Sequence, residues 1–110
     1  MLDAPAFFFP TMKLTTQRLY SVYILWSDRG CRFYIGVTEN VDYRVAQHNA
    51  GVSKWTKRYA GSWDLVWKRE FDSLGEARRF EVKLKRQKGG HGFWGLTGLD
   101  PGDFKVSSGS

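Results

Sequence analysis

The sequence predicts a single α+β domain in which strands and helices follow in the order β-β-α-β-α. The chain has 110 residues, a length that supports one core rather than two. Its hydrophobic content of 42% and aromatic content of 16% are too high for a disordered chain. Stretches rich in β-branched and aromatic residues alternate with stretches that have helical periodicity. We expect a three-stranded, mainly antiparallel sheet flanked by helices.

Three regions are expected along the chain. Residues 1–18 mix Pro, Phe, Thr and Lys without a hydrophobic period, which is typical of a flexible leader. Residues 19–90 carry the predicted elements and form the expected domain. Residues 91–110 are rich in Gly and Ser and are expected to be a tail, with one more apolar turn around Phe93 and Trp94.

The first two elements are expected to form a hairpin. Residues 19–26 are β-branched and aromatic and predict a strand, residues 27–30 a turn, and residues 31–36 a second strand. A turn centred on Asp28 and Arg29 would place Tyr23 opposite Tyr34, with both rings on one face of the sheet.

A helix is predicted after the hairpin, over residues 41–50. Thr38 or Asn40 is its expected N-cap, and Gly51 its stop signal. Residues 53–61 follow as a basic and aromatic loop.

The third strand is predicted over residues 63–71. Ser73 and Glu76 then form a capping box, which opens a helix that should run to about Lys88. The glycines at 89–90 end that helix.

The positive charge is concentrated in one part of the chain. The net charge is +6, and residues 53–91 hold that whole excess, because the segments on either side nearly balance. A localised basic face favours a polyanion partner, with nucleic acid first and an anionic membrane surface second.

Several classes of protein are disfavoured. Cys31 is the single cysteine, which prevents an intramolecular disulfide, and with two histidines it gives no zinc-ligand spacing. No apolar run approaches the ~20 residues that span a bilayer. The phenylalanines at 7–9 end at Pro10 and lack a basic segment before them, so a signal peptide is not expected. A cytoplasmic location fits these features.

The last predicted helix carries a carboxylate in an unusual position. At about 100° per residue, Glu81 falls between Leu74 and Ala77 on the apolar arc. A carboxylate on this side is costly unless it is paired or binds a cation. One interpretation is therefore a cation ligand, and the other is a Glu at the edge of the arc, paired with Arg78 or Lys85.

The first predicted helix carries Arg44 and His48 one turn apart, beside Val41 and Val45. An Arg fork suits phosphate, and an imidazole exchanges a proton near neutral pH. The alternative is an ordinary amphipathic helix whose polar residues border the core.

The predicted hairpin carries a further polar cluster, the phenols of Tyr23 and Tyr34, with Gly36 at the end of the second strand. The phenols either serve chemistry or are core aromatics with exposed hydroxyls. Gly36 either allows a close backbone approach or only ends the strand.

The order of these residues resembles the GIY-YIG nuclease superfamily. Tyr34-Ile35-Gly36 matches the second half of its signature, and Ser21-Val22-Tyr23 keeps the Tyr of the first half. Arg44 and His48 resemble the Arg and His of the family helix, and Glu81 resembles the metal-binding Glu of its later helix. The likeness is greatest to small stand-alone bacterial members, which are related to the N-terminal nuclease domain of the excision-repair subunit UvrC.

The resemblance implies an endonuclease that hydrolyses a DNA phosphodiester bond with one divalent cation, Mg²⁺ or Mn²⁺. Glu81 would hold the cation and Arg44 the phosphate. Tyr23 would act as the general base or position the attacking water, with His48 helping to take its proton. Tyr34 would hydrogen-bond the water or the phosphate. The implied catalytic residues are thus Tyr23, Tyr34, Arg44, His48 and Glu81.

The loop over residues 53–61 is the predicted nucleic-acid-binding segment. It interleaves cations with aromatic rings, which is typical of segments that hold phosphates and stack on bases. Its candidate residues are Lys54, Trp55, Lys57, Arg58 and Tyr59. The alternative is a solvated loop whose aromatic rings pack back on the core.

The leading interpretation is a small endonuclease that acts on branched, damaged or single-stranded DNA. RNA is not excluded as a substrate, and the sequence leaves the oligomeric state open. The alternatives are a non-catalytic nucleic-acid-binding module that keeps the fold, and an interaction domain whose basic face binds an acidic protein.

Overall fold

The strands form one antiparallel sheet in the order β2-β1-β3, within the residues that the computed structural model describes, 18–88 and 90–104. In that part of the chain the elements are β1 (Tyr20–Ser27), β2 (Arg32–Thr38), α2 (Val41–Asn49), η1 (Lys57–Tyr59), β3 (Trp63–Phe71), α3 (Leu74–Gln87), α4 (His91–Thr97) and η2 (Pro101–Asp103). The predicted α+β class and the order of the first five main elements are confirmed. The predicted leader lies outside the described residues, except for Arg18.

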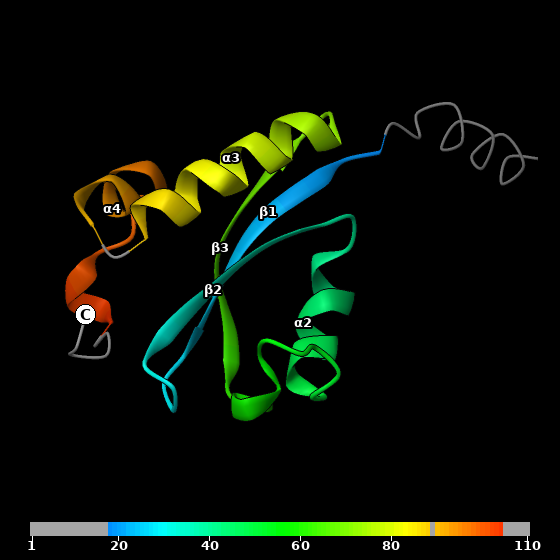
Figure 1. Cartoon of the computed structure of the whole chain (residues 1–110), viewed down its shortest axis with the longest axis vertical. Coiled ribbons are helices and arrows are strands. Elements are labelled where there is room, and N and C mark those ends of the chain that lie inside the picture. The colour runs from blue at the N-terminus through cyan, green and yellow to red at the C-terminus, as the bar shows by residue number, and fades with distance from the viewer. Residues whose placement is uncertain (1–17, 89, 105–110) are drawn as a thin grey trace, which may run out of the picture.

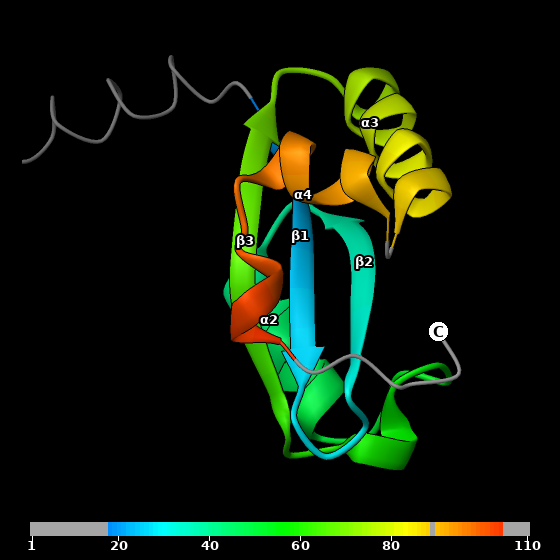
Figure 2. The ribbon, with the colours of Figure 1, turned by 90° about the vertical axis from the view of Figure 1, so that its left-hand side faces the viewer.

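The sheet is covered on both faces, and the central strand β1 is therefore buried along nearly its whole length. Alternate side chains of this strand point to opposite faces. Val22, Ile24 and Trp26 pack with residues of α3 and α4, whereas Tyr23 and Leu25 pack towards α2. Accordingly, α4 lies in front of the sheet and α2 behind it when the strands are seen side by side (Figure 2).

The predicted register of the hairpin is wrong by two residues. Tyr23 lies opposite Gly36 rather than Tyr34. The reason is the length of the turn, because residues 28–31 form a four-residue loop in which Cys31 takes a left-handed conformation with φ of 51°. An even shift preserves the sheet face of every side chain. Tyr23 and Tyr34 therefore still share one face, as predicted.

The second strand also extends further than predicted. It begins at Arg32 and remains paired with β1 up to Thr38, so the expectation that Gly36 might end the pairing is wrong. The third strand has its predicted bounds. A register shift in its pairing with β1, between Ile24 and Leu25, locally disrupts the ladder.

Helix α2 is fixed at its start by Asn40, whose side chain accepts a hydrogen bond from the Tyr43 backbone N–H. It ends at Asn49, one residue before the predicted end, and the chain turns away through Gly51 with φ of 82°. The positive φ explains why a glycine follows this helix.

Helix α3 begins as its capping box predicts. The Ser73 hydroxyl accepts a hydrogen bond from the Glu76 backbone N–H at 3.1 Å. The helix ends at Gln87, with Lys88 as its C-cap. It packs on the face of the sheet opposite α2, against residues of all three strands (Figures 1 and 2).

Residues 91–104 contribute to the core. The apolar turn expected around Phe93 and Trp94 is helix α4, and Phe93 is fully buried. Its ring lies 5.1 Å from that of Phe33, which also contacts Phe104 at 5.0 Å between centroids. No helix among the described residues has the length and apolarity that a membrane span requires.

Candidate active site

A buried chain of hydrogen bonds joins the sheet, α2 and the basic loop. Tyr23 Oη lies 2.9 Å from His48 Nε2, and His48 Nδ1 lies 2.7 Å from Thr56 Oγ1. All three residues are fully buried. His48 thus has a partner on each ring nitrogen, which fixes the orientation of its imidazole.

The position of Tyr23 depends on the glycine that faces it across the strands. A Cβ on Gly36 would lie 2.7 Å from Tyr23 Oη, so only glycine leaves room for the phenol over β2. The Tyr34 ring completes the aromatic wall, 6.2 Å from the Tyr23 ring and 4.7 Å from the His48 ring between centroids. The close approach predicted for Gly36 is therefore to the Tyr23 side chain.

Arg44 occupies the turn of α2 before His48 and is half-buried. Its guanidinium donates a hydrogen bond to Gln47 Oε1 at 2.7 Å. A guanidinium has five N–H donors, so this bond leaves others for an anion. The positive charge thus lies next to the buried phenol and imidazole.

Burial shifts the pKa values of Tyr23 and His48 in the directions that favour the neutral form of each side chain. It raises the pKa of Tyr23 to about 12, with the Tyr34 phenol and the Glu81 charge adding to the rise while the Arg44 guanidinium opposes it. Burial, aided by the Arg44 charge, lowers the pKa of His48 to about 4. At neutral pH a neutral phenol therefore faces a neutral imidazole.

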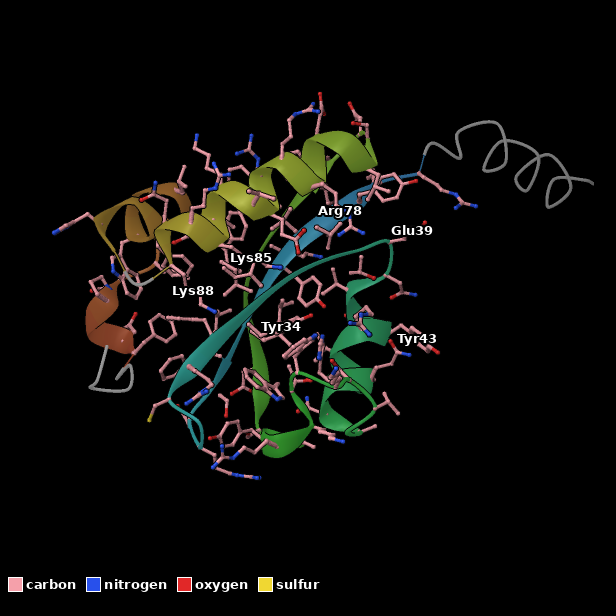
Figure 3. The ribbon with its side chains drawn as sticks, in the orientation of Figure 1. Tyr34, Glu39, Tyr43, Arg78, Lys85 and Lys88 are labelled. Atoms are coloured by element: carbon pink, nitrogen blue, oxygen red, sulfur yellow. The ribbon has the colours of Figure 1, made fainter. Side chains whose placement is uncertain are left out.

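Glu81 is buried on the core side of α3, as its place on the helical wheel predicts, with 7% of its surface exposed. It is also ion-paired on its own helix, to Arg78 at 3.5 Å and to Lys85 at 3.0 Å. Both cations are more than half exposed, unlike the carboxylate. Figure 3 shows both side chains on the side of α3 that faces β2. The ion pairing with Arg78 or Lys85, which was one of the two interpretations of Glu81, is thus present with both residues.

Glu81 is a single carboxylate ligand, which suits a hard cation that keeps most of its waters. Among residues 18–88 and 90–104, no three His, Cys, Asp or Glu side chains come together. Mg²⁺ commonly binds through one or two carboxylates plus waters and substrate phosphates. The buried carboxylate is neutralised by exposed, movable cations, so a divalent ion can take their place. Glu81 therefore fits this kind of ligation.

The structure brings the five predicted catalytic residues toward one place. Tyr23, Tyr34 and His48 are in direct contact. Arg44 and Glu81 lie close enough to influence the pKa of Tyr23. Helix α3 covers the opposite face of the sheet from α2, so Glu81 approaches the other four residues from a different layer of the fold (Figure 2).

The basic loop divides into an exposed and a packed part. Trp55 is 76% exposed, with Lys54 Nζ 5.2 Å from its ring centroid, and Lys57 is also exposed. In contrast, the Tyr59 ring is half-buried, and Arg58 lies 5.4 Å from its centroid. The contact of these residues with nucleic acid stays a prediction, and the geometry favours Trp55 over Tyr59 as the free ring.

Two residues of the site carry no pattern that sequence reasoning would single out. Thr56 stands between Trp55 and Lys57 in the basic loop. Its hydroxyl is nevertheless the second hydrogen-bond partner of the His48 ring, after the Tyr23 phenol. Trp63 donates from its indole N–H to the Thr56 carbonyl at 3.0 Å, and its ring contacts that of Tyr34. The one available signal is that Thr56 is a small hydroxyl residue inside an otherwise bulky, charged segment.

Comparison with known proteins adds independent evidence. The sequence model of the GIY-YIG catalytic domain matches residues 19–92. A UPF0213 protein of Nitratidesulfovibrio vulgaris is 35% identical over 71 residues, which cover 64% of each chain. A UPF0213 protein of Halobacterium salinarum is 35% identical over 68 residues, which are 62% of this chain and 87% of that protein.

A eukaryotic protein is also similar. The structure-specific endonuclease subunit SLX1 of Rattus norvegicus is 42% identical over 72 residues, which are 58% of this chain and 26% of the rat protein. The match thus spans slightly under two thirds of the Nitratidesulfovibrio relative and about a quarter of the rat one.

Proposed function

The chain belongs to the GIY-YIG family, and from this membership we propose that it is a divalent-metal-dependent endonuclease that hydrolyses DNA phosphodiester bonds. The observation that carries the proposal is the buried hydrogen-bond chain from Tyr23 through His48 to Thr56, next to Arg44. Titratable groups whose pKa values are shifted this strongly by burial and a neighbouring charge are typical of functional sites.

Tyr23 and His48 are arranged for a proton relay. Water attacks phosphorus, a new P–O bond forms, and the bond from phosphorus to the leaving sugar oxygen breaks. The water gives a proton to Tyr23 Oη while the phenolic proton passes to His48 Nε2, 2.9 Å away. The relay requires the imidazole tautomer whose Nδ1–H donates to Thr56 Oγ1.

Arg44 would hold the scissile phosphate, and the bound phosphate would make His48 a better base. Its charge is one of the two causes of the lowered His48 pKa. A phosphodiester bound to the guanidinium offsets that charge, so the His48 pKa should rise when substrate arrives. Basicity would then increase at the step that uses it.

Glu81 would hold the divalent cation, with water and phosphate oxygens as the other ligands. When bound, such a cation polarises the phosphate and stabilises the leaving oxygen. Arg78 and Lys85 are close enough to Glu81 to keep its charge balanced before the ion binds. Their exposed side chains can then turn to the DNA backbone.

The test is cleavage of end-labelled DNA by the purified protein with Mg²⁺ or Mn²⁺. Splayed, flapped, single-stranded and blunt duplex substrates should be compared. Glu81→Gln is expected to lower the rate at least 100-fold, because it removes the cation ligand. Glu76→Gln is the matched control, since Glu76 is an exposed carboxylate on the same helix, and its rate should stay within twofold.

A non-catalytic nucleic-acid-binding module is the alternative, favoured only by the exposed basic loop. It predicts DNA binding without product in any metal, and equal binding by the wild type and Glu81→Gln. Both outcomes together would contradict the nuclease proposal.

A further inference from the structure

A basic groove runs along the outer edge of β2, on the side of the molecule that faces the viewer in Figure 3. Its volume is about 510 Å³, and α3 and the Trp55 loop form its walls. Lys85 and Lys88 enter it from α3, and Arg32 enters from the start of β2. The described residues that line the groove include no carboxylate, and Lys85 is also ion-paired at 3.0 Å with Glu81, which is not part of the lining.

The three cations of the groove are held close together. Lys88 Nζ donates a hydrogen bond to the Phe33 carbonyl at 3.3 Å, which fixes its ammonium against the strand. Burial lowers the pKa of Lys88, and the charges of Lys85 and Arg32 lower it further. Like charges repel, so their convergence is stabilised when an anion lies among them.

The opposite wall offers a flat aromatic surface. Trp55 is the most exposed large hydrophobic residue in the described part of the chain, at 76%. Its ring lines the groove, and Lys54 Nζ lies 5.2 Å from the ring centroid. A ring beside a cation is suited to stack on a nucleobase whose phosphate the cation holds.

The groove leads to the candidate active site through Tyr34. This ring lines the groove and also lies 4.7 Å from the His48 ring between centroids. A strand lying in the groove would therefore pass next to the relay of Tyr23 and His48.

An unpaired strand uses this surface fully, whereas a duplex does not. In a double helix the bases are stacked inside, so only phosphates could reach the groove and Trp55 would have no base to stack on. An unpaired strand offers phosphates to the cations and a base face to the indole together.

We propose that the groove at the β2 edge binds an unpaired DNA segment next to the scissile phosphate, with Trp55 stacking on a base and Arg32, Lys85 and Lys88 holding the backbone. This inference rests on the proposed function for the position of the scissile bond. The binding itself does not depend on catalysis.

The test measures binding without metal, so that no cleavage occurs. Fluorescence anisotropy of a labelled oligothymidylate of about 12 nucleotides is compared with a blunt duplex of the same length, in EDTA. We expect the single strand to bind at least tenfold more tightly. Trp55→Ala should lower single-strand affinity about tenfold, the effect of one lost base stack, and duplex affinity less than twofold. Trp55→Phe should recover most of the loss.

Matched controls separate the groove from general surface charge. Tyr43→Ala removes another exposed aromatic ring, on α2, and should leave the affinity unchanged. Lys88→Gln should reduce the slope of log affinity against log salt concentration for single-strand binding by the amount of about one phosphate contact. Lys83→Gln, on the exposed side of α3, should change this slope less.

Three results would overturn the inference: equal affinity for single strand and duplex, equal loss of both in Trp55→Ala, or tighter binding of the matching oligoribonucleotide. The proposed function fails differently, since it predicts cleavage in Mg²⁺ or Mn²⁺ that Glu81→Gln abolishes. Binding without cleavage would contradict the nuclease alone, and cleavage without single-strand preference would contradict the groove alone.

Discussion

Gly36 and Tyr23 face each other across the β1–β2 pair, and a Cβ at position 36 would lie 2.7 Å from the Tyr23 hydroxyl oxygen. The glycine of the second signature half thus makes space for the tyrosine of the first half. The phenol crosses over the neighbouring strand and reaches His48 on α2. The two halves of the signature are therefore one steric unit.

Gly36→Ala should damage the site through this contact. The new methyl group must push the phenol away from β2, which lengthens the hydrogen bond from Tyr23 to His48. We expect a loss of about 1–3 kcal/mol in the free energy of unfolding, measured by urea denaturation, and at least a tenfold lower cleavage rate. Gly95→Ala is the control, because its Cβ would meet nothing within 4 Å. Because Gly95 lies within helix α4, alanine at this position should leave the stability of the protein unchanged or raise it slightly.

Tyr23→Phe separates the hydroxyl from the ring. The variant keeps the aromatic packing but leaves His48 Nε2 buried without its partner, which should cost about 1–3 kcal/mol of stability. Cleavage should fall far more than this loss of folded protein explains, because the relay loses its first member. Tyr43→Phe, at a side chain that is 61% exposed, should change neither quantity. Full activity in Tyr23→Phe would exclude the relay.

Local signals in the sequence predicted the elements well. Ser73 caps α3 and Asn40 caps α2, because each side chain satisfies a backbone N–H that the helix leaves unpaired. Glu81 could be placed on the core side of its helix from periodicity alone, since that angle depends on spacing within one element.

Features that depend on two elements were not predictable in the same way. The register of the hairpin depended on whether its loop had two or four residues, and the left-handed Cys31 decided it. The partnership of Thr56 with His48 arises because the basic loop folds back over α2. No residue pattern within either segment encodes that contact.

The buried His48 should make stability depend on pH. Its pKa is lowered from 6.5 to about 4 in the folded protein. Between these two pH values the unfolded state therefore binds a proton that the native state does not bind. Stability from this group is therefore fully present above pH 6.5 and declines as the pH falls toward 4. The loss should reach roughly 3 kcal/mol at most.

The measurement is the free energy of unfolding in urea at several pH values from 4.5 to 7.5. His48→Gln removes the titrating group, so the difference between wild type and variant should shrink or reverse as the solution becomes acidic. His91→Gln, at the exposed start of α4, should follow the wild type. Parallel pH curves for wild type and His48→Gln would show that burial does not hold His48 neutral.

Thr56 should act by positioning His48 rather than by touching the substrate. Its hydroxyl is 2.7 Å from Nδ1, so Thr56→Val removes the partner that favours the Nδ1–H tautomer while nearly keeping the side-chain shape. Stability should fall by about 1–3 kcal/mol because the Nδ1 group is left unsatisfied. The cleavage rate should fall at least tenfold with little change in DNA affinity.

Thr56→Ser distinguishes positioning from packing. Serine keeps the hydroxyl and loses the methyl group, so it should restore the tautomer and most of the rate despite its lower stability. ¹⁵N chemical shifts of the His48 ring report the tautomer directly and should match in wild type and Thr56→Ser but differ in Thr56→Val. A Thr56→Val protein with the wild-type ring shifts and a slow rate would place the defect elsewhere, because the tautomer would then not depend on the threonine hydroxyl.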